Sequence, residues 1–149
     1  MSRRSRAREV ALQILFEDDV NTRGTAEELK NFVRARLNNE ENEAFCLSLI
    51  LGVRRNQREL DETLSAIAQN WSLARMASTD RNVLRLGAYE VLFTETPYKV
   101  AINEAIELAK RYGNAHSAQF VNGILDKLPR QQSPQGPENL PSGSASNEN

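Results

Sequence analysis

The spacing of apolar residues constrains the fold of this chain more than any other feature. Across residues 5–128 they recur every three or four positions, as on the stripe formed by Ala7, Val10, Ala11, Ile14 and Leu15. That interval places the side chains on one face of a helix. We find no segment with the period of two that is typical of a half-buried strand. The sequence therefore predicts an all-α fold.

Capping and breaking residues indicate where the helices begin and end. Thr25 and Glu28 have the spacing of a capping box, and we expect Thr79 to cap a later helix. A break is expected near Asn56, and Gly113 is expected to end a helix in the left-handed conformation. Gly87, inside an apolar helix, indicates a close helix–helix contact. The predicted helices span residues 5–19, 25–37, 40–67 with the break, 79–93, 100–112 and 117–128, with a short turn from residue 72.

The end of the sequence differs in composition from the rest. Four of the five prolines come after Leu128, among serine, glutamine and asparagine, so we expect residues 129–149 to be a disordered tail. The remaining length suits one domain. No apolar run approaches the 18 residues of a membrane span and no signal peptide is evident, so the expected location is the cytoplasm.

The charges are unevenly distributed along the chain. The net charge is only −1, but residues 1–8 carry +4, residues 9–128 carry −4 and residues 129–149 carry −1. The basic segment consists of Arg3, Arg4, Arg6 and Arg8. Such an asymmetry is typical of a segment that contacts nucleic acid or an acidic partner, although the solvated start of a helix is an equally good interpretation.

Residues capable of catalysis or metal binding are scarce. The single cysteine, Cys46, excludes an internal disulfide and any multi-cysteine metal site, and the single histidine, His116, excludes two-histidine metal sites. Cys46 falls on an apolar helix face, where a buried structural thiol is expected. No glycine-rich phosphate loop or nucleophile elbow is present. We therefore expect a binding protein, with no enzymatic activity, cofactor or metal.

Several side chains fall outside the predicted core stripes. Arg8, Leu12 and Phe16 share the opposite side of the first helix, where they face either a second helix layer or another molecule. Asp80 either stabilises the start of its helix or anchors a partner.

The later helices offer further candidates. Arg81 and Arg85 form a row with Tyr89 on one side of their helix. Lys99 lies where a helix begins, a place that the helix dipole makes unfavourable for a cation, so phosphate contact is an alternative to simple solvation. Phe120 lies at the edge of its core stripe, where packing is the simpler interpretation and base stacking the alternative.

Four sequence strings carry a resemblance to a known family. They are RAREVALQILF (6–16), DRNVLRLGAYE (80–90), PYKVAINEAIELAK (97–110) and FVNGILDK (120–127), and together they run through most of residues 5–128. They closely resemble the NusB family of transcription antitermination factors. His116 departs from the pattern, because many relatives carry an acid there.

The resemblance implies a fold, partners and site residues. The fold would be two small helical bundles of about seven helices, covering about residues 5–70 and 71–128. The chain would bind the boxA element of ribosomal RNA leaders together with NusE, a small-subunit ribosomal protein, and help RNA polymerase to resist termination. The alternative is a helical protein–protein adaptor in ribosome biogenesis with incidental RNA contact. The implied RNA contacts are Arg3, Arg4, Arg6, Arg8, Gln13, Arg85, Lys99 and Phe120, and the implied partner contacts are Leu12, Phe16, Asp80 and Arg81.

Overall fold

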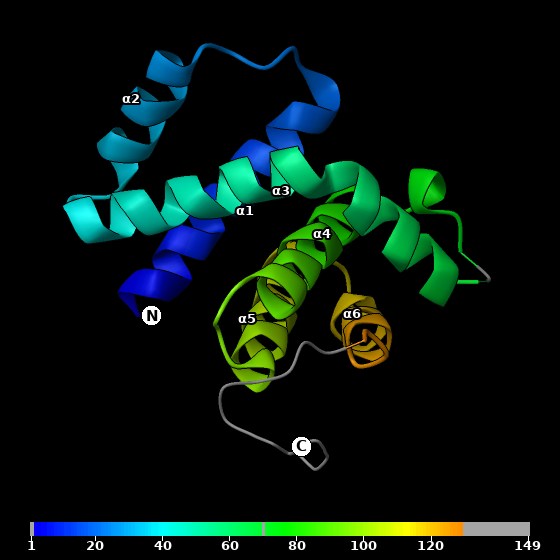
Figure 1. The fold of residues 1–149 in the computed structure, drawn as a ribbon. Helices are drawn as coiled ribbons and strands as arrows, with labels where there is room; N and C mark the ends of the chain where they lie inside the picture. Colours follow the sequence, from blue (N-terminus) through cyan, green and yellow to red (C-terminus); the bar gives the residue numbers. More distant parts are fainter. Residues whose placement is uncertain (1, 70, 130–149) are drawn as a thin grey trace, which may run out of the picture.

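The structure, a computed structural model, describes residues 2–69 and 71–129, and these ranges contain helices and no strand (Figure 1). The all-α prediction is therefore confirmed. The expected disordered tail lies, from residue 130 onward, outside the described residues. No helix in the described part is long and apolar enough to cross a membrane. The elements are α1 (Arg3–Val20), α2 (Ala26–Arg36), α3 (Glu40–Ile67), the 3-10 turn η1 (Leu73–Arg75), α4 (Ser78–Phe93), α5 (Tyr98–Tyr112) and α6 (Ser117–Leu125).

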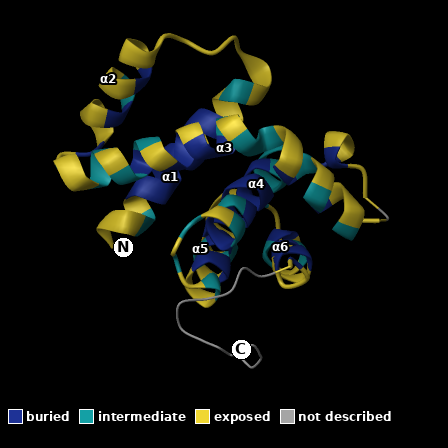
Figure 2. Ribbon diagram, in the orientation of Figure 1, coloured by how far each residue is buried: buried dark blue, intermediate teal, exposed yellow. Residues whose placement is uncertain are grey.

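Helix α4 is the centre of the molecule. It packs against α1 and α3 on one side and against α5 and α6 on the other. Figure 2 shows α4 buried along most of its length, whereas α2 is largely exposed. Apolar side chains from all of these helices form one continuous hydrophobic cluster. The two halves of the chain thus meet at α4.

Helix starts follow local capping chemistry at α2 but not at α4. The Thr25 side chain accepts from the backbone N–H of Glu28, and the Glu28 carboxylate accepts from the N–H of Thr25, which confirms the capping box. The prediction that Thr79 caps α4 is wrong. The helix begins at Ser78, after Ala77, with no side-chain cap, and the Ser78 hydroxyl donates to Asp19 on α1.

Helix α3 runs without interruption through Asn56, so the predicted break is wrong. The Asn56 side-chain amide donates to the carbonyl of Gly52, one turn earlier, and is thereby satisfied inside the helix. At Gly52 itself a Cβ atom would overlap the ring of Tyr89 on α4. This glycine therefore lets α3 and α4 approach each other closely.

The two other glycines singled out from the sequence have different outcomes. At Gly87 a Cβ would lie 2.7 Å from Leu125 Cδ1 on α6 and 3.1 Å from Ala105 Cβ on α5, which confirms the predicted close contact. Gly113 is extended, with φ −95° and ψ −167°, so the predicted left-handed stop is wrong. A Cβ at Gly113 would overlap the Ser117 side chain, so the tight turn into α6 explains this glycine.

Candidate nucleic-acid and partner surfaces

Three of the four N-terminal arginines are exposed on the first turns of α1. Arg3, Arg4 and Arg6 are exposed; Arg6 pairs with Glu9 at 3.1 Å, and the Arg4 guanidinium lies 4.1 Å from the centre of the Phe45 ring. The helix begins at Arg3, so these residues form the start of α1 and not a separate arm. Because the positive end of the helix dipole disfavours cations, these charges do not stabilise α1. Arg3 and Arg4 are available to an external anion, whereas Arg6 shares its charge with Glu9.

Arg8 differs from its neighbours because it is buried. Its Nε and Nη2 atoms donate to the two carboxylate oxygens of Glu90 on α4 at 2.6 and 2.7 Å, and its Nη1 lies 3.6 Å from Glu104 on α5. Burial by itself lowers the pKa of Arg8, but the hydrogen bonds and charge of Glu90 and the charge of Glu104 raise it above its ordinary value. The expected phosphate-facing position of Arg8 is therefore not what the structure shows.

Lys99 is exposed near the start of α5 and follows the loop that leaves α4. Between this loop and the first turns of α1 lies a groove of about 760 Å³. We call it the α1–α5 groove; its charged lining residues are Arg4, Arg8, Glu95 and Glu104, and Phe45, Thr96, Pro97 and Val100 also line it. The structure thus brings Arg4 of α1 and the loop before Lys99 to the walls of one groove, whereas Arg3, Arg6 and Lys99 are exposed outside its lining.

A second groove contains two aromatic side chains. Trp71 is 61% exposed and contacts Phe120 edge to face, with ring centres 5.5 Å apart and an interplanar angle of 71°. We call this the aromatic groove; it has a volume of about 600 Å³, and its lining includes Gln69, Trp71, Gln119, Phe120, Gly123 and Lys127. Phe120 is half-buried, so it both packs on the core and offers an edge to the groove.

Trp71 was missed by sequence reasoning. The signal was present, because the only tryptophan of the chain stands between a long helix and a short turn, outside any apolar stripe. A large aromatic residue with no stripe to join is a candidate for an exposed contact.

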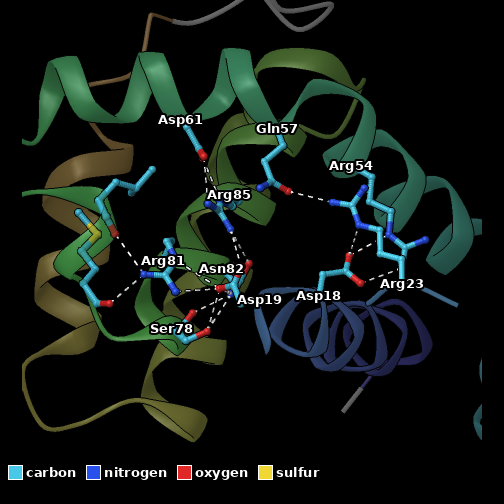
Figure 3. Close-up of polar contacts among 12 residues, drawn as sticks. Asp18, Asp19, Arg23, Arg54, Gln57, Asp61, Ser78, Arg81, Asn82 and Arg85 are labelled. Atoms are coloured by element: carbon cyan, nitrogen blue, oxygen red, sulfur yellow. Dashed lines mark hydrogen bonds and ion pairs between the residues drawn. The ribbon is translucent and has the colours of Figure 1, made fainter. Parts of the chain in front are cut away.

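The arginine row of α4 lies in a polar network between helices (Figure 3). Arg85 is buried and donates from Nε and Nη2 to Asp61 on α3 at 2.8 and 2.9 Å, and from Nη1 to Asp19 on α1 at 3.2 Å. Arg81 donates to Asp19 and to the carbonyls of Leu73 and Met76. We call this the Asp19 network; its members are Asp19, Asp61, Ser78, Arg81, Asn82 and Arg85.

Both arginines are thus committed to joining α1, α3, η1 and α4. Burial alone lowers the pKa of Arg85, whereas its bonds and charge interactions with Asp61 and Asp19 raise the pKa above its ordinary value. The expected RNA-facing position of Arg85 is therefore not what the structure shows, whereas Arg81 is half-buried and its expected partner contact stays a prediction.

The outer side of α1 divides into a buried and an exposed part. Leu12 is buried in the core, so the interpretation of a second helix layer is correct for this residue. Phe16 is 42% exposed and Val20 is 65% exposed, and Gln13 lies on the same exposed stripe. Asp80 is half-buried in the first turn of α4, where its carboxylate suits the helix dipole. We call the part of α1 that carries Phe16 and Val20 the partner face; Asp80 is a separate candidate on α4.

The single cysteine and the single histidine differ in their degree of burial. Cys46 is buried, and burial raises the pKa of its thiol to about 12, which confirms the expected structural thiol. His116 is exposed at the start of α6 and makes no side-chain cap there. Within residues 2–69 and 71–129 no three histidine, cysteine or acidic side chains are grouped as a metal site would require.

Comparison with known proteins gives one consistent result. The model of the NusB family matches residues 5–130. The chain is 49% identical over 129 residues to the transcription antitermination protein NusB of Anaeromyxobacter dehalogenans, with 85% of this chain and 90% of that protein covered. It is 43% identical to the protein of the same name from Bacillus licheniformis, with 86% and 96% covered.

Solved structures agree with the sequence comparison. T. maritima NusB superimposes with a TM-score of 0.74 at 37% identity, covering 85% of this chain and 89% of that one. A crystal structure described as antitermination factors NusB and NusE in complex with double-stranded RNA gives a TM-score of 0.74 at 26% identity, covering 85% of this chain and 95% of that one.

Proposed function

Because the chain belongs to the NusB family, we propose that it is a transcription antitermination factor that binds RNA and is not an enzyme. Its RNA ligand is the single-stranded boxA element of ribosomal RNA leaders, which it binds together with NusE. The complex then helps RNA polymerase to resist termination, and the proposed place of action is the cytoplasm.

The observation that carries the proposal is the set of exposed cations on the first turns of α1 and at the start of α5. Arg3, Arg4 and Arg6 lie at the dipole end that disfavours them, Arg4 lines the α1–α5 groove, and Lys99 follows the loop that also lines it. Neutralising phosphates releases counterions, so each phosphate contact on a single strand contributes about −0.7 to the slope of log K against log salt. The three arginines together are expected to contribute about −2.

The aromatic groove supplies contacts of a different kind. Unstacked bases bind aromatic faces, and polar side chains can hydrogen-bond their edges. Trp71 and Phe120 provide the rings, with Gln119 and Lys127 in the same lining. We propose that this groove holds a base of the RNA.

The partner face is the proposed contact with NusE. Phe16 and Val20 are large apolar side chains exposed on neighbouring turns of α1, which is typical of a surface covered by another protein. Asp80, in the first turn of α4, is the proposed polar anchor. A partner that adds its own RNA contacts increases the affinity of the pair over that of either protein alone.

The test is a fluorescence titration of a boxA-like RNA and a scrambled RNA of equal composition, with and without NusE. We expect preference for the boxA-like RNA and tighter binding with NusE present. The triple variant Arg3→Ala, Arg4→Ala, Arg6→Ala is expected to reduce the salt slope by about 2. The matched control replaces three exposed cations of α2, which packs on α3, with alanine and should leave the slope unchanged: Lys30, Arg34 and Arg36.

Equal affinity for both RNAs, with and without NusE, would contradict this function. Tight binding of NusE in that case would favour the adaptor alternative, because Phe16 and Val20 would still account for a protein contact. An unchanged salt slope in the triple arginine variant would refute the assignment of these residues alone.

A further inference from the structure

The buried Arg8–Glu90 ion pair joins α1 to α4 next to the α1–α5 groove, which Arg8 itself lines. Arg8 is on α1 and Glu90 on α4, and their side chains are 5% and 2% exposed. The two parallel hydrogen bonds of 2.6 and 2.7 Å fix the direction of both side chains as well as their distance. Arg8 lines the groove, but with only 5% of its side chain exposed it offers a ligand little surface, and Glu90 offers less.

Glu90 also holds the loop that leads to Lys99. The Thr96 hydroxyl donates to Glu90 Oε2 at 3.1 Å, and the Thr94 hydroxyl donates to the Glu90 backbone carbonyl at 2.7 Å. Pro97 then caps α5, which begins at Tyr98 and has Lys99 in its first turn. The carboxylate that binds Arg8 is therefore the same one that fixes the loop.

A second carboxylate, that of Glu104, joins α5 to the first turns of α1. Glu104 accepts from the Ser5 hydroxyl at 2.8 Å, and its Oε1 lies 3.6 Å from Arg8 Nη1. Arg8 and Ser5 belong to the same turns of α1 as the exposed arginines. The spacing between the start of α1 and the start of α5 thus depends on Arg8 and its two acids.

We propose that Arg8 and Glu90 are a positioning pair for RNA binding, which sets the distance between the exposed arginines of α1 and Lys99. The pair acts through this geometry and not through contact with a phosphate. This inference rests on the proposed function, since it concerns how the same surface recognises RNA. It explains why Arg8, one of the four arginines of the basic segment, is buried. A buried ion pair fixes the relative position of the helices that it joins more than it stabilises the fold.

Glu90→Gln distinguishes positioning from contact. If Arg8 contacted phosphate, removing the buried acid would leave RNA affinity unchanged or increase it. If the pair positions the groove, affinity falls by about 2- to 150-fold, the range of coupling between interacting residues. The measurement is a titration of the isolated full chain with the boxA-like RNA, at a temperature where circular dichroism shows each variant to be folded.

A double-mutant cycle with Lys99→Ala identifies what is positioned. The loss of RNA affinity caused by Glu90→Gln should be much smaller in the Lys99→Ala background, because the distance between the α1 arginines and residue 99 then no longer affects binding. Equal losses in both backgrounds would overturn the proposal, and so would a Glu90→Gln variant that binds RNA as well as the original chain.

Two further variants keep the test decisive. If Glu90→Gln does not fold, the double variant Arg8→Met, Glu90→Leu removes both charges of the buried pair and should fold. If the pair positions the groove, the loss of RNA affinity in this double variant also depends on whether Lys99 is present. If Arg8 contacted a phosphate, the loss would add to that of Lys99→Ala, and the salt slope would fall by about 0.7. Asp18→Asn breaks a similar two-bond pair with Arg54, at 2.8 and 2.8 Å, near the other end of α1. It should leave RNA affinity unchanged, and an equal loss there would refute positioning by Glu90.

The outcome for the original chain separates this proposal from the function on which it rests. If the original chain does not prefer the boxA-like RNA, the proposed function fails. If it does and Glu90→Gln binds equally well, only the positioning role fails.

Discussion

Replacing Asp19 with asparagine tests how strongly the Asp19 network joins α1 to α4. The Asp19 carboxylate accepts from Ser78 Oγ at 2.9 Å, from Arg81 Nη2 at 2.9 Å and from Asn82 Nδ2 at 2.7 Å (Figure 3). Burial raises its pKa, but the hydrogen bonds and the charge of Arg81 outweigh burial and lower the pKa from 3.8 to about 2. The network thus favours the ionised carboxylate in the folded state.

The pKa difference gives the size and the direction of the effect. A carboxyl whose pKa falls from 3.8 to about 2 on folding stabilises the folded state by about 2 kcal/mol when ionised. Asp19 lies near the surface, so screening by solvent reduces this to about 1–2 kcal/mol. Because the folded pKa is the lower one, the contribution is complete above the unfolded pKa. It is lost as the pH falls toward 2, about half of it by pH 3.

The assay is urea unfolding followed by circular dichroism at pH 7 and pH 3. At pH 7 Asp19→Asn should lower the free energy of unfolding by about 1–2 kcal/mol, and at pH 3 the difference from the original chain should be about half as large. Glu62→Gln is the control at pH 7; its side chain is 72% exposed and pairs with Arg58 at 3.9 Å, so a change below about 0.5 kcal/mol is expected. A difference for Asp19→Asn of the same size at both pH values would refute the argument that the network depresses its pKa.

Two further pairs of variants test packing and capping by the same unfolding measurement. Gly87→Ala should destabilise the protein by about 1–2 kcal/mol because the new methyl group lies 2.7 Å from a side chain of α6. Gly123→Ala should be neutral or stabilise the protein by up to about 1 kcal/mol, because nothing lies within 4 Å of the new methyl group. A loss at Gly123 as large as that at Gly87 would show that helix contact is not the cause. Thr25→Ala should cost about 1 kcal/mol because it removes the cap of α2, whereas Thr79→Ala should cost less than about 0.5 kcal/mol. Equal losses at the two threonines would contradict the assignment of the cap.

Features that depend on neighbours along the chain could be predicted from the sequence. The apolar spacing determined the all-α fold, and the capping box of Thr25 needs only residues three positions apart. Burial of Cys46 followed from its place on an apolar face, and the close contact at Gly87 from a glycine inside an apolar helix. The exposed positions of Arg3, Arg4 and Arg6 agree with the charge count of the first eight residues.

Features that depend on a distant helix could be decided only by the tertiary structure. Arg8 has the same chemistry as Arg6, yet it is buried because Glu90, 82 residues away, lies opposite it. Arg85 meets Asp61 and Asp19 in the same way, and Trp71 meets Phe120 on another helix. Helical periodicity tells which residues share a face, because that depends on 3.6 residues per turn. Which helix covers that face depends on how the helices pack, and packing decides whether an arginine meets solvent or a buried carboxylate.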